Sequence, residues 1–145
     1  MYIAFSSRKI KFISVIISRK TAADPGILKK NEKKGAGKMA AMNMNKEQFQ
    51  QMMEQGKLVL IDFWAPWCGY CRRIAPAYDK IAAQYGQDMI VAKVNIDEEA
   101  QLAQKELIEV IPTLVLYQGG EAIGSIVAPE SKAMIETFLQ EALGK

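Results

Sequence analysis

The segment that decides the fold is Leu58-Val59-Leu60-Ile61-Asp62-Phe63-Trp64-Ala65-Pro66-Trp67-Cys68-Gly69-Tyr70-Cys71. Its first half, residues 58–64, is apolar apart from Asp62, which is typical of a strand buried on both faces. Its second half ends in the chain's only two cysteines, which are separated by two residues where a helix is predicted to begin. Unpaired amides and the dipole of a helix N-terminus stabilise a thiolate, the reactive form of cysteine. The segment therefore predicts a strand that leads into a Cys-x-x-Cys pair suited to thiol–disulfide exchange.

The composition excludes several other kinds of site. The chain of 145 residues contains no histidine, which excludes histidine-based acid–base catalysis, histidine-containing triads and zinc sites with histidine ligands. Two cysteines cannot complete a four-cysteine zinc site within one chain, so a metal would need carboxylate ligands or a second chain. A purely structural disulfide at this spacing would close a very short loop and stabilise little. We therefore expect a redox-active disulfide, with no metal and no bound cofactor.

Charge divides the chain near residue 38. Residues 1–38 hold ten Lys/Arg and two Asp/Glu, a net charge of +8, whereas residues 39–145 hold nine and fourteen, a net charge of −5. We expect a basic N-terminal extension over residues 1–38 and a folded domain over residues 39–145. The acidic domain offers no argument for nucleic-acid binding, whereas the basic extension offers a weak one. The apolar stretch 12–17 is far too short to span a membrane.

Three interpretations of the extension stay open. Its charged, glycine-containing second half is typical of a disordered linker. Its apolar stretch, followed by small residues at 21–24, is compatible with a secretory signal, although the apolar core is short for one. The interpretation that we favour is a leader translated from a misplaced start codon. Lys34-Gly35-Ala36 can be encoded by a purine run containing AAGGAG, a bacterial ribosome-binding sequence, at a workable distance before Met39.

From Asn45 onward the pattern alternates between helices and strands. Asn45 and Gln48 resemble a capping box that opens a helix ending at Gly56. Three further helices are predicted at about 68–85, at 98–107 and from Ser131 to Gly144, and four strands at 58–64, 89–96, 113–117 and 122–127. A crossover gives parallel strands and the final hairpin gives antiparallel ones. We therefore expect an α/β fold with a mixed sheet of four to five strands flanked by helices, in which only residues 39–44 could supply the fifth strand.

This order of elements, with a Cys-x-x-Cys pair after the first long strand, resembles the thioredoxin family. The resemblance covers nearly all of residues 45–145 and rests on residues 61–71, on Ala92-Lys93-Val94-Asn95-Ile96-Asp97 and on Ile111-Pro112-Thr113. Several motifs in the right order are more specific than a lone Cys-x-x-Cys. The resemblance implies a thioredoxin fold and a protein-disulfide reductase, whose partners are thioredoxin reductase and disulfide-containing protein substrates. It also implies a monomer with neither nucleic-acid nor membrane partners, and two cysteines confined to one site suit the reducing cytoplasm.

The resemblance also assigns roles in the exchange reaction. Cys68 corresponds to the exposed nucleophilic cysteine that attacks a target disulfide, and Cys71 to the buried one that then closes the Cys68–Cys71 disulfide. Asp62 corresponds to a buried carboxylate that helps to deprotonate Cys71 by way of water, and burial should raise its pKa. Lys93 corresponds to the lysine that modulates this carboxylate. The alternative for Asp62 and for Lys93 is an ordinary solvent-facing position on a strand.

A second group of residues corresponds to the surface that docks targets: Trp67, Gly69, Tyr70, Ile111, Pro112, Val127 and Ala128. The family has a cis proline at the position of Pro112, and a cis bond there would leave the backbone beside Cys68 free to pair with an extended substrate. The alternative is a trans proline that opens an edge strand. Phe63 and Trp64 are expected to lie in the core.

Two places depart from the family pattern. Tyr70 stands where most thioredoxins have proline, and its backbone N–H adds a donor that can stabilise the Cys68 thiolate. We therefore expect a reduction potential above the roughly −270 mV typical of thioredoxin. Ala128 and Pro129 stand where a Gly-Ala pair is usual, so partner docking can differ. Two other functions stay open, an exported thiol oxidase or isomerase and a thioredoxin-fold binding module without catalysis.

Overall fold

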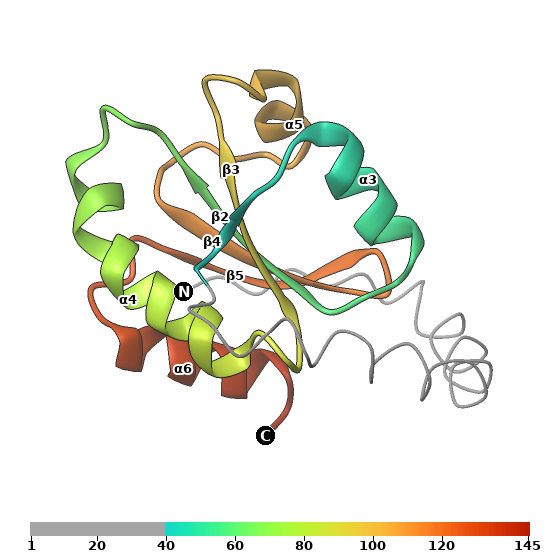
Figure 1. The fold of residues 1–145 in the computed structure, drawn as a ribbon, viewed down its shortest axis with the longest axis vertical. Helices are drawn as coiled ribbons and strands as arrows, with labels where there is room; N and C mark the ends of the chain where they lie inside the picture. Colours follow the sequence, from blue (N-terminus) through green and yellow to red (C-terminus); the bar gives the residue numbers. More distant parts are fainter. Residues whose placement is uncertain (1–39) are drawn as a thin grey trace.

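The computed structural model describes residues 40–145, so the expectations for residues 1–38 and for Met39 lie outside the described residues. Along the described part the elements are β1 (Met42–Asn43), α3 (Lys46–Glu54), β2 (Val59–Trp64), α4 (Gly69–Tyr85), β3 (Ile90–Asn95), α5 (Ala100–Lys105), β4 (Thr113–Gln118), β5 (Glu121–Val127) and α6 (Lys132–Ala142) (Figure 1). The predicted alternation of helices and long strands is confirmed. No helix within residues 40–145 is long and apolar enough to cross a membrane.

The strands form one mixed sheet in the order β1-β3-β2-β4-β5. Strands β2 and β3 run parallel and β4 and β5 run antiparallel, as the crossover and the hairpin predicted. The structure adds that β1 and β3 run parallel and that β2 and β4 run antiparallel. The fifth strand is β1, a pair of residues at the edge of the sheet that align with Ala92 and Lys93. The strand that carries Asp62 is therefore central, with β3 on one side and β4 on the other.

Alternate residues of β2 face two separate hydrophobic cores, because successive side chains of a strand point to opposite faces of the sheet. Leu60 packs in the core beneath α4 and α6, with Tyr78 and Phe138. Phe63, which is fully buried as predicted, packs in the other core with residues of α3 and α5. The two pairs of helices accordingly cover opposite faces of the sheet (Figure 1). Asp62, two residues after Leu60, lies on the α4 face.

Helix α4 is attached to the centre of the sheet by a buried polar contact. The hydroxyl group of Tyr78 lies 3.1 Å from the carbonyl oxygen of Leu60 and 2.7 Å from that of Ala92, so that one side chain of α4 contacts both β2 and β3. Burial raises the pKa of Tyr78 well above its usual range, which keeps the hydroxyl protonated and able to donate. This contact holds α4 in place over the strand that leads into the cysteines.

The helix ends follow the predicted caps in two cases and differ in one. Asn45 and Gln48 form the predicted capping box, each side chain accepting the other residue's backbone N–H. Ser131 caps α6 as expected. Helix α5 is shorter than the predicted 98–107, since no side chain caps its first turn and Leu107 adopts a left-handed φ of 58° that ends it.

Candidate active site

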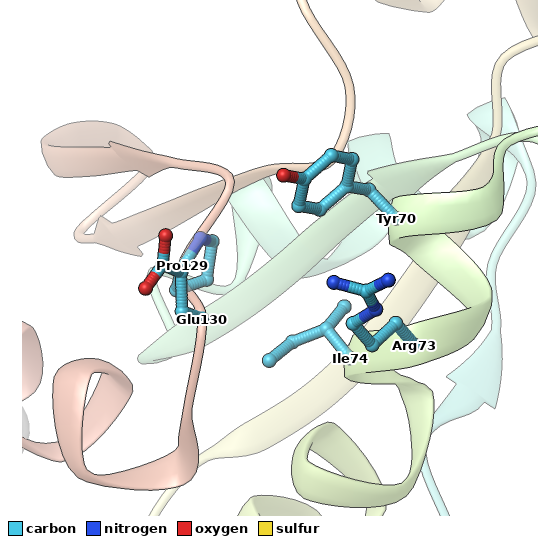
Figure 2. Close-up of a pocket in the computed structure, with 5 residues that line it drawn as sticks. All are labelled: Tyr70, Arg73, Ile74, Pro129 and Glu130. Carbon is cyan, nitrogen blue, oxygen red and sulfur yellow. The ribbon is translucent and has the colours of Figure 1, made fainter.

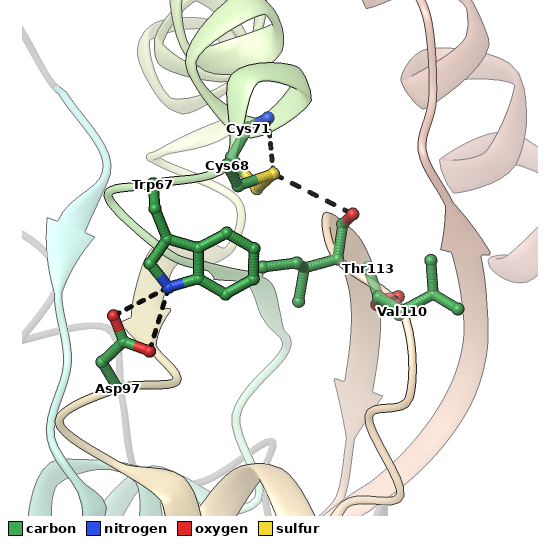
Figure 3. The surroundings of a disulfide bond; sticks show 7 residues. Trp67, Cys68, Cys71, Asp97, Val110 and Thr113 are labelled. Carbon is green, nitrogen blue, oxygen red and sulfur yellow. Dashed lines mark hydrogen bonds between the residues drawn. A yellow bond between two sulfur atoms is a disulfide. The ribbon is translucent and has the colours of Figure 1, made fainter.

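Cys68 and Cys71 are joined by a disulfide at the start of α4 (Figure 3), with their Cα atoms 5.3 Å apart. Cys68 is the N-cap residue of the helix, and its Sγ accepts a hydrogen bond of 3.1 Å from the backbone N–H of Cys71. A side chain in this position receives one of the amides that the first helical turn leaves unpaired. The sulfur of Cys68 therefore lies where the helix N-terminus favours negative charge. The donor is the amide of Cys71, whereas the sequence had pointed to that of Tyr70.

The disulfide lies in a shallow, mostly apolar setting. Both cysteines are largely buried, since Cys68 is 7% exposed and Cys71 is 3% exposed. The two cysteines pack with Ala65 and against the partly buried Ile96 and Ile111. A target disulfide must therefore be brought to Cys68 from the surface that surrounds it.

Trp67 is the most prominent part of that surface. Its side chain is 66% exposed, yet its indole N–H donates to both carboxylate oxygens of Asp97, at 3.2 and 3.0 Å (Figure 3). The sequence analysis quoted Asp97 within a motif and gave it no role. The parallel pairing of β2 with β3 could have pointed to it, because the carboxyl ends of neighbouring parallel strands meet at one edge of the sheet. Asp97 follows β3 at the edge where Trp67 follows β2.

The segment around Pro112 lies against the other side of the disulfide. The Ile111–Pro112 peptide bond is cis, as the resemblance implied. The carbonyl oxygen of Ile111 is 4.0 Å from the Sγ of Cys68, and the carbonyl oxygen of Pro112 accepts a hydrogen bond of 2.8 Å from the N–H of Ala128. The hydroxyl of Thr113 donates to the carbonyl of Val110. Three segments distant in the chain thus meet at Cys68.

The residues expected to dock targets differ in how accessible they are. Trp67, Tyr70, Gly69 and Val127 are exposed, and Ile111 and Ala128 are half-buried. Pro112 is buried, so its contribution to this surface comes from the backbone rather than from the ring. Val110, which the sequence analysis did not select, is a further exposed apolar residue next to Ile111. Its only signal in the sequence was its position before the Ile-Pro-Thr motif.

Asp62 is buried beneath this surface, and the solvent-facing alternative for it is wrong. It is 2% exposed, and its Oδ1 atom has no hydrogen-bond partner among the described residues. Burial raises the pKa of Asp62 from its usual value of 3.8 to about 7, and the positive charge of Lys93 partly opposes that rise. Asp62 and Lys93 are partners in the register of β2 and β3. The site therefore holds a carboxyl group that can be either protonated or ionised near neutral pH.

Lys93 and Trp64 are neighbours of Asp62 on β3 and β2. Lys93 is half-buried, and its Nζ lies 5.2 Å from the centroid of the Trp64 ring. Trp64 was expected to lie in the core, but it is only half-buried. The reason is its position as the last residue of β2, where the strand ends and the loop toward α4 begins. Its ring packs against the cluster that contains both cysteines.

Comparison with known proteins identifies the family. The family model described as Thioredoxin matches residues 40–141. This chain belongs to the thioredoxin family. It is 42% identical over 94 residues to Thioredoxin 1 of Nostoc sp., covering 65% of this chain and 88% of that protein. It is 36% identical over 104 residues to the thioredoxin of Alicyclobacillus acidocaldarius, covering 72% and 99% of the two chains.

Solved structures agree with the thioredoxin assignment. A mutant thioredoxin from Halobacterium salinarum superimposes with a TM-score of 0.65 at 27% identity, over 74% of this chain and 94% of that one. The thioredoxin of Plasmodium falciparum gives a TM-score of 0.64 at 28% identity, over 70% and 98%. The mixed sheet flanked by helices is therefore a thioredoxin fold. This thioredoxin-family chain is a thiol–disulfide oxidoreductase with protein-disulfide reductase activity, carried by the Cys68–Cys71 pair.

The thioredoxin site is built around a disulfide. Within residues 40–145, no group of three or more histidine, cysteine, aspartate or glutamate side chains is placed to hold a metal ion. The site contains the two sulfur atoms of the disulfide and, on neighbouring strands, the side chains of Asp62 and Lys93. The disulfide can accept two electrons when it is reduced to two thiols.

Proposed function

We propose that this protein reduces disulfides of target proteins in the cytoplasm with electrons from a thioredoxin reductase, Cys68 attacking and Cys71 resolving. The Cys68 thiolate attacks one target sulfur, a Cys68–target disulfide forms, and the other target sulfur leaves as a thiolate that takes up a proton. Cys71 then loses its proton and its sulfur attacks the Sγ of Cys68. The Cys68–Cys71 bond forms and the second target sulfur leaves, so the target gains two electrons.

The observation that carries this order of attack is the position of Cys68 as the N-cap of α4. Its Sγ accepts the Cys71 amide and lies beside the exposed surface around Trp67. A thiolate is stabilised there and lies next to a surface that a target can approach. Cys71 is a residue of the helix itself and is less exposed, which suits a thiol that reacts only with its neighbour.

In the same proposal, Asp62 accepts the proton that Cys71 loses. A pKa of about 7 allows this carboxyl group to take up a proton and to return it near neutral pH. Its unpartnered Oδ1 leaves an acceptor available inside the protein. Lys93 modulates the carboxyl group, because its charge holds the pKa of Asp62 below the value that burial alone would produce.

The proposed docking surface surrounds Cys68 and consists of Trp67, Gly69, Tyr70, Ile111, Pro112, Val127 and Ala128. Exposed aromatic and apolar side chains beside a reactive atom are typical of a recognition surface. The backbone at Ile111 lies next to the sulfur of Cys68 and suits pairing with an extended target segment.

The proposed electron donor and domain division have separate support. A bifunctional thioredoxin reductase/thioredoxin of Mycobacterium leprae is 37% identical over 95 residues, which are 66% of this chain and 21% of that protein. Its two named activities support a thioredoxin reductase as the partner here.

The family match over 40–141 supports a thioredoxin domain over residues 39–145, with residues 1–38 as an extension. In this proposal the protein acts as a monomer. The chain's only two cysteines are confined to the redox site, so none is used for a separate structural disulfide, which suits a reducing compartment.

The cycle is tested with NADPH, the host's thioredoxin reductase and insulin as the disulfide substrate. We expect turnover by the full chain, none by Cys68→Ser, and a trapped target-linked intermediate with Cys71→Ser. Turnover that persists in Cys68→Ser would contradict the assignment of the nucleophile. Cys68→Ser is also tested for growth of a strain that lacks the gene. If this inactive variant restored growth, the binding-module alternative would replace the enzymatic one.

A further inference from the structure

A pocket of about 310 Å³ borders the active-site motif at Tyr70 (Figure 2). Tyr70, Arg73 and Ile74 of α4 line one side, and Pro129 and Glu130, which lie between β5 and α6, line the other. Its volume is at the lower end of the range for small-ligand pockets and suits a single side chain better than a cofactor. Ile74, which is buried, supplies an apolar base. The pocket belongs to none of the catalytic steps described above.

The α4 side of the pocket presents two hydrogen-bond donors. Arg73 is exposed, and its guanidinium carbon lies 5.4 Å from the centroid of the Tyr70 ring. The contact orients the planar group and leaves its N–H edge accessible. In Figure 2 the Tyr70 ring and the Arg73 guanidinium both extend from α4 toward the segment that carries Pro129. The phenol hydroxyl of Tyr70 is a second donor on the same side.

The opposite side of the pocket is coupled to the reaction centre. Ala128, which precedes Pro129, has a left-handed φ of 47° and donates its N–H to the carbonyl oxygen of Pro112. The same cis-proline segment places the carbonyl of Ile111 beside the Sγ of Cys68. Pro129 follows Ala128 directly, so the pocket adjoins the backbone that is bonded to the cis-proline segment. These are the positions, Ala128 and Pro129, at which the chain departs from the usual Gly-Ala pair.

We propose that this pocket is a specificity subsite that binds a carboxylate side chain, aspartate or glutamate, located within two residues of the reactive cysteine of a target protein. The carboxylate is held by the Arg73 guanidinium and the Tyr70 hydroxyl, and its aliphatic stem packs on Ile74. Arginine binds carboxylates through two parallel N–H donors, which is a strong and directional interaction. The inference rests on the proposed reduction cycle and adds the class of target that the cycle prefers.

Glu130 limits the strength of this preference. Its carboxylate points away from Arg73 in Figure 2, and it is exposed at the rim. A second carboxylate nearby opposes an acidic occupant by like-charge repulsion, reduced by solvent. Arg73 and Glu130 should therefore have opposite effects on the same selectivity.

The test uses symmetric peptide disulfides in which the residue one or two positions before or after the cysteine is Glu, Gln or Lys. Second-order rate constants for the reduced full chain are measured in single turnovers by quantifying the released thiol peptide. We expect the Glu peptide to react about three- to tenfold faster than the Gln peptide at one or more positions, with the ratio falling at high salt. Arg73→Gln should bring the ratio close to one, and Glu130→Gln should increase it.

Arg72→Gln is the matched control, because Arg72 is an equally exposed neighbour on α4 that does not line the pocket. It removes the same charge and should keep the Glu preference. Equal rates for Glu and Gln peptides at all positions would overturn the proposal, as would a preference that survives Arg73→Gln or is lost in Arg72→Gln. Faster reaction of the Lys peptide would also overturn it. Reduction of the Gln peptide monitors the cycle itself, so failure of the proposed function is distinguishable from failure of the subsite.

Discussion

The indole N–H of Trp67 donates to both carboxylate oxygens of Asp97, which lies 30 residues further along the chain. The contact joins the residue before Cys68 to the segment that follows β3. A large exposed aromatic side chain has many accessible orientations, and ordering it has an entropic cost on binding. Asp97 removes that cost in advance by holding the ring beside the disulfide.

We therefore expect Asp97→Ala to lower kcat/KM for insulin reduction about three- to tenfold, while the rate with a small aromatic disulfide changes less. Loss of one exposed hydrogen bond to a charged acceptor should lower the free energy of unfolding by about 1 kcal/mol. Asp97→Asn keeps one acceptor, so its kcat/KM and its free energy of unfolding should lie between those of the native chain and Asp97→Ala. Equal losses on the large and the small substrate would show that Asp97 acts on the chemistry rather than on docking.

Asp62 should make the oxidised protein less stable at high pH. The pKa of Asp62 is about 7 in the folded state, against 3.8 for the free side chain, so the folded state holds a proton that the unfolded state releases. The contribution of protonated Asp62 to the free energy of unfolding is complete below pH 3.8 and is lost as the pH rises to about 7. The shift corresponds to roughly 4 kcal/mol. Urea unfolding of Asp62→Asn should show a gain of roughly 2–4 kcal/mol over the native chain at pH 8 and almost none at pH 4; a pH-independent gain would contradict this account.

The same carboxyl group should govern the second chemical step. With Asp62→Asn, the attack of Cys71 on the Cys68–target disulfide should slow about 10- to 100-fold at pH 7, in the range of general acid–base catalysis. The native rate should rise with pH through an inflection near 7, and the variant should lack that inflection. Rapid-quench measurement of target release separates this step from the first attack. An unchanged profile in the variant would assign the proton acceptor elsewhere.

Tyr70 should raise the reduction potential, but modestly. The amide that bonds to the Cys68 sulfur belongs to Cys71, so the Tyr70 N–H acts only as one of the unpaired amides of the first turn. A contribution of 0.3–1 kcal/mol corresponds to about 6–20 mV. We expect a potential above roughly −270 mV for the native chain and a decrease of about that size in Tyr70→Pro. Equilibration with glutathione or a reference thioredoxin measures both, and Tyr70→Ala, which keeps the N–H, should stay near the native value.

The sequence by itself determined the elements whose signals are local. The apolar run ending at Trp64 predicted a buried central strand, and Asn45 with Gln48 predicted a helix start that the structure confirms. The Cys-x-x-Cys pair predicted the disulfide at the beginning of α4. Each of these depends on residues a few positions apart, where side-chain periodicity and capping are decided by the backbone alone.

Only the tertiary structure decided which distant groups meet. The register of β2 and β3 aligns Asp62 with Lys93, and the sheet edge joins Trp67 to Asp97. The packing of α4 beside the segment after β5 forms the pocket at Arg73, a residue with no signal of its own in the sequence. The amide bound to Cys68 and the incomplete burial of Trp64 likewise followed from how the helix lies on the sheet. Contacts across tens of residues depend on strand order and packing, which local patterns do not encode.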